Sequence, residues 1–279
     1  MAAISTLTKA KDLPALLSLG RPLVMGVLNI TPDSFSDGGQ FIDPQTALDH
    51  ARQMVAEGAD ILDVGAESTR PYGGMRPVSA ADEKARLAPV LGGAAKLGAP
   101  VSIDTLKAQI ADWALDEGAA IVNDVWGLQR DPDMAPLVAK RRVPVIVMHN
   151  RDAADPNVDI ITDVMAFFAR SLEIAMQAGI ARDNIILDPG IGFGKTPEQS
   201  ITCIARLAAF KQFGLPILLG ASRKKFINSV VPSQPQERIG GSLAAHIFGV
   251  ESGAEIVRVH DVKETVQALR VHSALRRAQ

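Results

Sequence analysis

The chain has little of several features that mark specialised protein classes. Of its 279 residues only Cys203 is a cysteine, which excludes an internal disulfide framework and suits a buried structural thiol. Aromatic residues make up 4%, which argues against a stacking platform for single-stranded nucleic acid. The net charge is −2 and no long basic run is present, so no nucleic-acid partner is expected.

Long apolar runs and common catalytic motifs are missing as well. No run approaches the roughly 18 apolar residues that a membrane span needs, and residues 1–20 lack a signal-peptide pattern. We therefore expect a soluble, cytoplasmic protein with no membrane partner. The sequence contains no H-E-x-x-H or Cys/His cluster, which argues against zinc, and no G-x-S-x-G elbow, which argues against an esterase.

Eight short apolar runs recur along the chain, separated by helical stretches that often end at glycine. Their continuous apolar character indicates parallel strands buried on both faces. Eight such units predict a single TIM (β/α)8 barrel domain over residues 1–279, with residues 1–21 as an N-terminal extension. An open doubly wound sheet is the alternative, and eight units favour closure over it. The predicted strands are Leu23–Asn29, Asp60–Val64, Val101–Asp104, Ala120–Asn123, Val145–Met148, Asn184–Leu187, Ile217–Leu219 and Glu255–Val259.

The segments between these runs divide into helices and long loops. The loops Ile30–Asp43 and Gly65–Val78 are rich in small residues and proline, and we expect them to act as lids. A third long loop is predicted over Gly220–Glu237. The predicted helices are Leu13–Leu19, Pro44–Glu57, Ala80–Leu97, Leu106–Glu117, Met134–Arg141, Asp159–Ala178, Pro197–Phe213, Arg238–Glu251 and Val262–Arg276.

Nearly every apolar run ends on a polar or charged residue. In a barrel the C-terminal ends of the strands meet at one rim, where active sites lie. The sequence therefore predicts one polar pocket built from distant segments. The strand-end residues are Asn29, Asp63, Asp104, Asn123, His149, Asp188, Ser222, Arg258 and His260.

Two groups of these residues suggest particular ligands. Asp104, Asn123 and Asp188 offer acceptors and donors that suit a flat ring with an N–H-rich edge, although each residue alone is equally typical of a helix cap. Arg258 and His260 are expected near Asn29, because the first and last strands are neighbours in a closed barrel. This group suits a diphosphate with Mg²⁺, and a surface pair is the alternative.

Two lysines follow strand ends in loops. The segment Gly190–Thr196 looks like a phosphate-binding P-loop, but Pro189 stands where that motif needs its first glycine. Its glycines are expected to let the backbone approach a flat ligand closely. Lys224, in the Ser-Arg-Lys segment, is a candidate ligand donor or Schiff-base amine, with an exposed surface lysine as the alternative.

Five motifs in this order resemble the dihydropteroate synthases. They begin at Asn29 (NITPDSFSDGG), Asp63 (DVGAESTRP), Asp188 (DPGIGFGK), Ser222 (SRK) and Arg258 (RVHD). The resemblance runs from about Pro22 to the last helix. It implies a TIM barrel, Mg²⁺, a homodimer, and the displacement of diphosphate from 6-hydroxymethyl-7,8-dihydropterin diphosphate by 4-aminobenzoate.

The resemblance also implies roles for single residues. It places the pterin ring against Asp104, Asn123, Met148, Asp188, Phe193, Gly220 and Lys224. It places the diphosphate against Asn29, Thr69, Arg70, Arg258 and His260, with Asn29 as the metal ligand. It places 4-aminobenzoate against Thr69, Arg70, Pro71 and Ser222, and implies catalytic roles for Lys224, Arg258, His260 and Asp104.

Two segments depart from the family's usual pattern. Tyr72–Arg76 lengthens the second loop, and His149–Asp152 replaces a Met-x-Gly type of continuation. Both departures concern the lids and the aminobenzoate end of the site. The rival functions are a pterin-binding methyltransferase domain, which has no diphosphate to bind, and a non-catalytic pterin- or diphosphate-binding paralogue.

Overall fold

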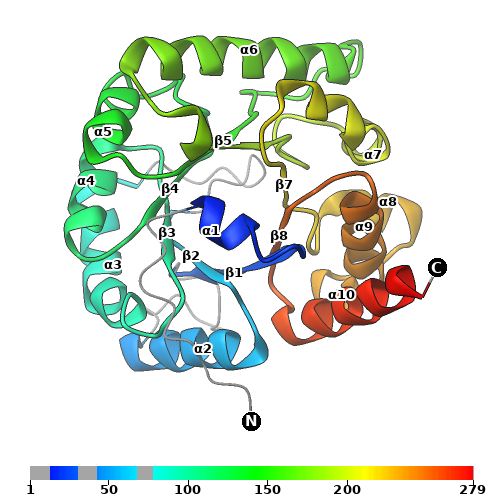
Figure 1. Cartoon of the computed structure of the whole chain (residues 1–279), viewed down its shortest axis with the longest axis horizontal. Helices are drawn as coiled ribbons and strands as arrows, with labels where there is room; N and C mark the ends of the chain where they lie inside the picture. The colour runs from blue at the N-terminus through cyan, green and yellow to red at the C-terminus, as the bar shows by residue number, and fades with distance from the viewer. Residues whose placement is uncertain (1–12, 31–42, 68–77, 279) are drawn as a thin grey trace.

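A computed structural model describes residues 13–30, 43–67 and 78–278, which form the predicted (β/α)8 barrel (Figure 1). Its parallel strands lie in the order β6-β5-β4-β3-β2-β1-β8-β7, and a parallel bridge between Leu187 and Ile217 closes β6 onto β7. The helices surround the sheet, so the strands are buried on both faces. The strands are β1 (Leu23–Asn29), β2 (Ile61–Gly65), β3 (Val101–Asp104), β4 (Ile121–Asp124), β5 (Val145–Met148), β6 (Ile185–Asp188), β7 (Leu218–Leu219) and β8 (Ile256–Val259).

Helices occupy the predicted positions between the strands. Gly58 and Gly179 end α2 and α6 in the left-handed conformation, as their positions predicted. The helices are α1 (Leu13–Leu17), α2 (Pro44–Glu57), α3 (Ala80–Ala94), α4 (Ala108–Asp116), α5 (Met134–Arg141), α6 (Ile160–Ala178), α7 (Pro197–Ala205), α8 (Lys225–Val230), α9 (Ile239–Glu251) and α10 (Val262–Arg277), with short 3₁₀ turns η1 (Arg182–Asn184), η2 (Leu207–Phe213) and η3 (Pro235–Glu237).

Two predictions are wrong in detail. The helix expected over Pro197–Phe213 is α-helical only in α7 and continues as η2, where Leu207 and Phe210 are buried three residues apart, matching three residues per turn. The loop expected over Gly220–Glu237 contains α8 and η3. Ile227 of α8 packs so closely on Gly241 that a Cβ there would lie 2.5 Å from it, which anchors this short helix.

The inside of the barrel has two layers of different character. The lower layer is apolar, and Leu16 of α1 packs into it, so α1 covers this end of the barrel (Figure 1). Because side chains on a strand alternate between its faces, the residue two positions further on also points inward and lies higher in the barrel. On β1 both Leu23 and Met25 belong to the lower layer. The lower layer consists of Leu23, Met25, Ile61, Ile121, Ile146, Ile186, Leu218 and Ile256.

The upper layer follows from the same periodicity and is largely polar. Two positions beyond Ile61, Ile121, Ile186 and Ile256 stand Asp63, Asn123, Asp188 and Arg258. These side chains lie toward the C-terminal ends of the strands. The alternation therefore places the polar set at the end of the barrel opposite to α1.

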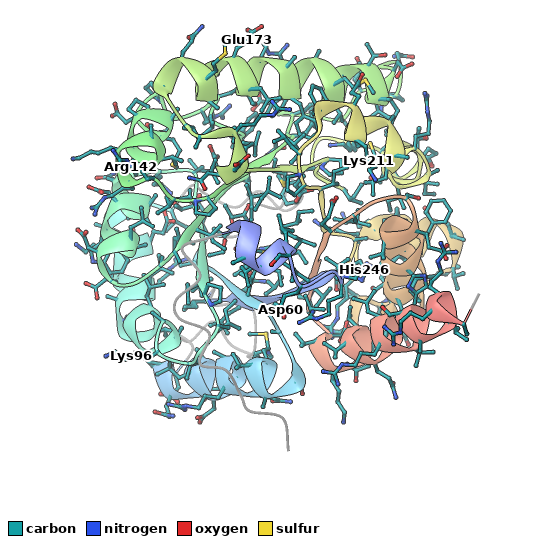
Figure 2. All side chains as sticks on the ribbon, in the orientation of Figure 1. Asp60, Lys96, Arg142, Glu173, Lys211 and His246 are labelled. Carbon is teal, nitrogen blue, oxygen red and sulfur yellow. The ribbon has the colours of Figure 1, made fainter. Side chains whose placement is uncertain are left out.

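The outer surface has the character of an ordinary charged exterior. Lys96, Arg142 and Glu173 lie at the perimeter of the ring of helices (Figure 2). None of the helices in the described ranges is long and apolar enough to cross a membrane.

Candidate active site

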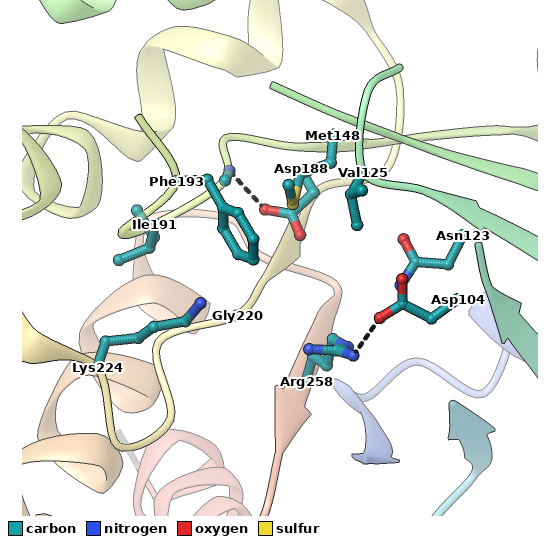
Figure 3. A pocket seen from close by; sticks show the side chains of 11 residues that line it. Asp104, Asn123, Val125, Met148, Asp188, Ile191, Phe193, Gly220, Lys224 and Arg258 are labelled. Atoms are coloured by element: carbon teal, nitrogen blue, oxygen red, sulfur yellow. Dashed lines mark hydrogen bonds and ion pairs between the residues drawn. The ribbon is translucent and has the colours of Figure 1, made fainter. Parts of the chain in front are cut away.

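A pocket lies at the C-terminal ends of the strands, directly above the polar layer (Figure 3). All seven residues predicted for the pterin ring line it, although they come from β3, β4, β5, β6 and the loops that follow the later strands. The structure thus brings together a set that spans more than 100 residues of the sequence. The lining residues are Asp104, Asn123, Val125, Met148, Asp188, Gly190, Ile191, Phe193, Gly220, Lys224 and Arg258.

Arg258 is the centre of a charged network in the floor of the pocket. Its Nε lies 2.6 Å from Asp63 Oδ2, and its Nη2 lies 2.8 Å from Asp104 Oδ2. Asn123 Nδ2 lies 3.2 and 3.3 Å from the two oxygens of Asp63. The network pairs each buried charge and joins β2, β3, β4 and β8 across the barrel.

Asp63 is a site residue to which the sequence analysis assigned no role. It is fully buried below the pocket and holds both Arg258 and Asn123 in place. It was predicted only as one of the polar strand ends, and its place two positions beyond the inward-facing Ile61 on β2 turns its side chain into the barrel. Val125 and Ile191 also line the pocket without having been predicted to do so, and Gly190 lines it as expected of the glycine-rich segment that begins there.

Burial disfavours the ionised form of the two pocket carboxyl groups, Asp104 and Asp188. It raises the pKa of Asp104 to about 7, with Arg258 opposing this rise and Asp63 adding to it. Burial also raises the pKa of Asp188, opposed by the Gly190 N–H and by Lys224. Positively polarised N–H groups of a ligand would relieve this cost, so both carboxyl groups favour such a ligand.

Two buried acceptors in the pocket are suited to a ligand's donors. Asp104 Oδ1 and Asn123 Oδ1 have no hydrogen-bond partner among the described residues. Buried polar atoms in native proteins are almost always paired, and exceptions often mark functional sites. These two oxygens are therefore placed to accept hydrogen bonds from the ring edge of a ligand.

The loop after β6 brings backbone close to the pocket. Gly190 has φ 65°, and a Cβ there would lie 2.0 Å from the His149 carbonyl oxygen, so only glycine fits. Its N–H donates to Asp188 Oδ1 at 2.7 Å (Figure 3). Phe193 lies with its ring centre 4.1 Å from Lys224 Nζ, a cation–π contact on the pocket wall.

The residues predicted for the diphosphate and aminobenzoate are only partly brought together. His260 Nδ1 lies 3.0 Å from Ser222 Oγ, which joins the ends of β7 and β8, but neither residue lines the pocket. Asn29 is the half-buried last residue of β1. Thr69, Arg70, Pro71 and the Tyr72–Arg76 extension lie outside the described residues.

The donors suit a lightly held metal ion better than a closed protein cage. The described residues contain no group of three or more His, Cys, Asp or Glu that could hold a metal. Asn29, at the end of β1, would offer one hard amide oxygen. Such a set fits Mg²⁺, which typically keeps several waters and is held by few protein oxygens together with substrate phosphates.

The barrel and its pocket define an enzyme that binds a flat, N–H-rich heterocycle, and the pterin binding enzyme family matches residues 25–260 of the chain. The dihydropteroate synthase of Bacillus subtilis (strain 168) is 45% identical over 91% of this chain and 89% of its own length. The chain belongs to the dihydropteroate synthase family.

Solved structures agree with this assignment. The dihydropteroate synthase of Xanthomonas albilineans with 4-aminobenzoic acid has a TM-score of 0.88 and 39% identity, covering 92% of this chain and 94% of that one. The enzyme of Thermus thermophilus in complex with 6HMPPP has a TM-score of 0.81 and 43% identity, covering 92% and 95%.

Proposed function

We propose that the chain condenses 6-hydroxymethyl-7,8-dihydropterin diphosphate with 4-aminobenzoate, giving 7,8-dihydropteroate and diphosphate. The observation that carries the proposal is the pocket itself, which gathers all seven residues predicted for the pterin ring. Relatives solved with 4-aminobenzoic acid and with 6HMPPP support the two substrates.

The pterin edge would bind to the polar end of this pocket. Asp104 and Asn123 present their unsatisfied oxygens to ring N–H groups, and Asp188 adds a third acceptor. Lys224 would donate to a ring heteroatom. Met148 and Phe193 supply the apolar walls against which a flat ring packs. The polar groups at the ring edge would fix the orientation of the pterin, and the apolar walls would exclude water from its faces.

The diphosphate would lie toward β1 and β8, against Asn29, Arg258 and His260. Among the described residues the two ion pairs of Arg258 use Nε and Nη2, so Nη1 is the nitrogen that would donate to a substrate oxygen. Mg²⁺ bound at Asn29 would neutralise part of the diphosphate charge and so make it a better leaving group. Arg258 would also stabilise the charge of the leaving diphosphate.

The nucleophile, 4-aminobenzoate, would enter from the rim beside Ser222. Thr69, Arg70 and Pro71, which the family resemblance also assigns to this substrate, lie outside the described residues. The amine of 4-aminobenzoate attacks the exocyclic methylene carbon as the bond from that carbon to the diphosphate oxygen breaks. The amine then loses a proton, so a strong general base is not needed for the attack. The role of the loops 30–43 and 65–78 in excluding water stays a prediction, because most of both loops lies outside the described residues.

A homodimer is the proposed assembly, through the helices late in the chain. Several large apolar side chains are exposed on α8, α9 and α10, and α9 contacts α10 directly. Exposed large apolar side chains that form a contiguous patch are typical of protein interfaces, and α9 and α10 are the pair shown in contact. The exposed side chains are Val230, Val231, Phe248, Val271 and Leu275. The cytoplasmic location stays a prediction.

The experiment that tests the reaction measures diphosphate release from the pterin diphosphate in Mg²⁺ buffer, with and without 4-aminobenzoate. Release that depends on 4-aminobenzoate, with an equal amount of dihydropteroate, is the expected result. Tight pterin binding without release would instead identify a non-catalytic paralogue. A protein that binds no pterin would overturn the pocket assignment itself.

A further inference from the structure

Lys195 is among the most deeply buried side chains of the molecule, with 1% of its surface exposed. Lysine is almost never buried to this degree unless its charge is paired or hydrogen-bonded. Its Nζ lies 2.6 Å from His149 Nδ1, 2.9 Å from Gly190 O and 3.1 Å from Phe193 O. An ammonium group has three N–H donors, and three acceptors thus surround it.

His149 extends this arrangement to the surface of the barrel. Its Nε2 lies 2.9 Å from Asp163 Oδ2 on α6. Burial and the neighbouring Lys195 lower the pKa of His149 to about 4, so the ring is neutral at pH 7. Nδ1 therefore accepts from Lys195 while the Nε2–H donates to Asp163. One proton arrangement satisfies the whole chain of bonds.

The two carbonyl groups that bind Lys195 belong to the ends of the glycine-rich loop. Gly190, at one end, donates its N–H to the pocket carboxylate of Asp188 at 2.7 Å. Phe193, at the other end, forms the pocket wall beside Lys224. The buried ammonium thus holds the backbone that orients one pocket carboxylate and one pocket ring, without lining the pocket itself.

We propose that Lys195 is a positioning residue for the pterin pocket, and that His149 holds its ammonium group so that it fixes the loop from Gly190 to Phe193. The inference rests on the proposed function of that pocket. It also gives a role to the lysine of a motif that merely looks like a P-loop. Here the lysine binds the loop's own carbonyl groups, and no substrate phosphate is needed to explain it.

The first test replaces the ammonium by a neutral chain of similar length. In Lys195→Met the three hydrogen bonds of Nζ are lost. The carbonyl groups of Gly190 and Phe193 then lose the charged donor that holds the loop in place. We expect 6-hydroxymethyl-7,8-dihydropterin, titrated by calorimetry, to bind about tenfold more weakly or worse. The KM for pterin diphosphate rises similarly, whereas kcat and the KM for 4-aminobenzoate change less than about threefold.

A matched pair at His149 separates the two ends of the chain of bonds. The side-chain oxygen of His149→Asn replaces Nδ1 as an acceptor for Lys195, while the longer His149→Gln places its amide near Nε2 and leaves Lys195 one acceptor short. Pterin affinity should stay within about threefold of wild type in the Asn variant and fall about tenfold in the Gln variant. This pair keeps the proposal testable even where Lys195→Met does not fold.

Phe168→Leu serves as the control for general loss of stability. Phe168 is fully buried in α6 and packs on Phe210 and Phe213, away from the pocket. It should lower the melting temperature without changing pterin affinity. If the Lys195 and His149 variants lose affinity only in proportion to stability, or not at all, the positioning role is overturned. A wild-type protein that binds no pterin would count against the proposed function instead.

Discussion

The lower and upper layers of the barrel are built from the same strands and differ almost completely in chemistry. On β8, Ile256 points into the apolar layer, and two residues later Arg258 points into the polar one. On β2 the same step leads from Ile61 to Asp63. Of the two layers inside the barrel, only the lower one is apolar, and the larger hydrophobic core lies between the strands and the helices. The upper layer is therefore available for function, at a cost in stability.

That cost is visible in the unpaired atoms of the upper layer. Asp104 and Asn123 each have a buried oxygen without a hydrogen-bond partner among the described residues. The residues named above for the lower layer have hydrocarbon or thioether side chains, which need no partner. Active sites commonly retain such unsatisfied groups because the ligand completes them. Substitutions in the upper layer should therefore change both stability and activity, whereas substitutions in the lower layer should change stability alone.

The largest effect is expected from Arg258→Leu in the upper layer. The substitution leaves Asp63 and Asp104 buried without their cation, and breaking a buried pair in this way costs about 3–5 kcal/mol. Activity should also fall below detection, because the proposed diphosphate contact is lost with the pocket floor. Urea unfolding and steady-state kinetics measure the two effects on the same samples.

A double variant sharpens this test. In Arg258→Leu with Asp63→Asn, one of the two carboxylates that lost their cation is replaced by a neutral amide. A large part of the lost stability should therefore return. Activity should not return with it. Recovery of both together would mean that Arg258 serves only to neutralise Asp63.

The second largest effect should come from Ile256→Ala, two residues earlier on β8. Ile256 is fully buried in the lower layer, and truncating such a side chain costs about 2–5 kcal/mol. Because this layer takes no part in binding, kcat/KM per folded molecule should stay unchanged. A change in KM for pterin diphosphate would contradict the separation of the two layers.

Asp104→Asn should separate stability from binding. The folded pKa of Asp104, about 7, lies above the ordinary 3.8. Its contribution to stability is therefore present below about pH 4 and is lost as the pH rises toward 7. The variant lacks this titration, so its melting temperature should fall less than that of wild type between these pH values.

The same variant should bind pterin more weakly. Its amide replaces a carboxylate acceptor that faces the N–H-rich ring edge, and we expect about tenfold lower affinity by calorimetry. If the melting temperatures of wild type and variant changed with pH in the same way, the raised pKa of Asp104 would be contradicted. Unchanged affinity would remove Asp104 from the proposed site.

The barrel and the polar strand ends could be predicted from local rules, whereas Met148, Phe193 and Gly220 were predicted as pocket residues only from the family resemblance. Apolar runs mark the strands, and the polar residues at their ends must meet at one rim. The sequence did not reveal the role of Asp63. Its partner Arg258 lies 195 residues away, and a periodic pattern does not show which distant residues form an ion pair. The same holds for Lys195 and His149, which are 46 residues apart. The lysine could be identified as unusual only once its burial was known.

The smallest effect is expected at a buried polar residue outside both layers. His246 of α9 is 1% exposed, and neither ring nitrogen has a hydrogen-bond partner among the described residues. Burial lowers its pKa to about 4 from the ordinary 6.5. Its unfavourable effect on stability should therefore appear as the pH falls from about 6.5 toward 4, where only the unfolded chain binds the proton.

His246→Leu should remove this acid sensitivity and raise stability by about 1 kcal/mol at neutral pH, with kcat and both KM values unchanged. Melting curves at several pH values measure the first effect and steady-state kinetics the second. If the variant is instead destabilised at every pH, His246 has a partner that binds it. His246 would then no longer count among the described residues with unsatisfied buried polar atoms. A larger share of those atoms would lie in the pocket, where a ligand can form the missing hydrogen bonds.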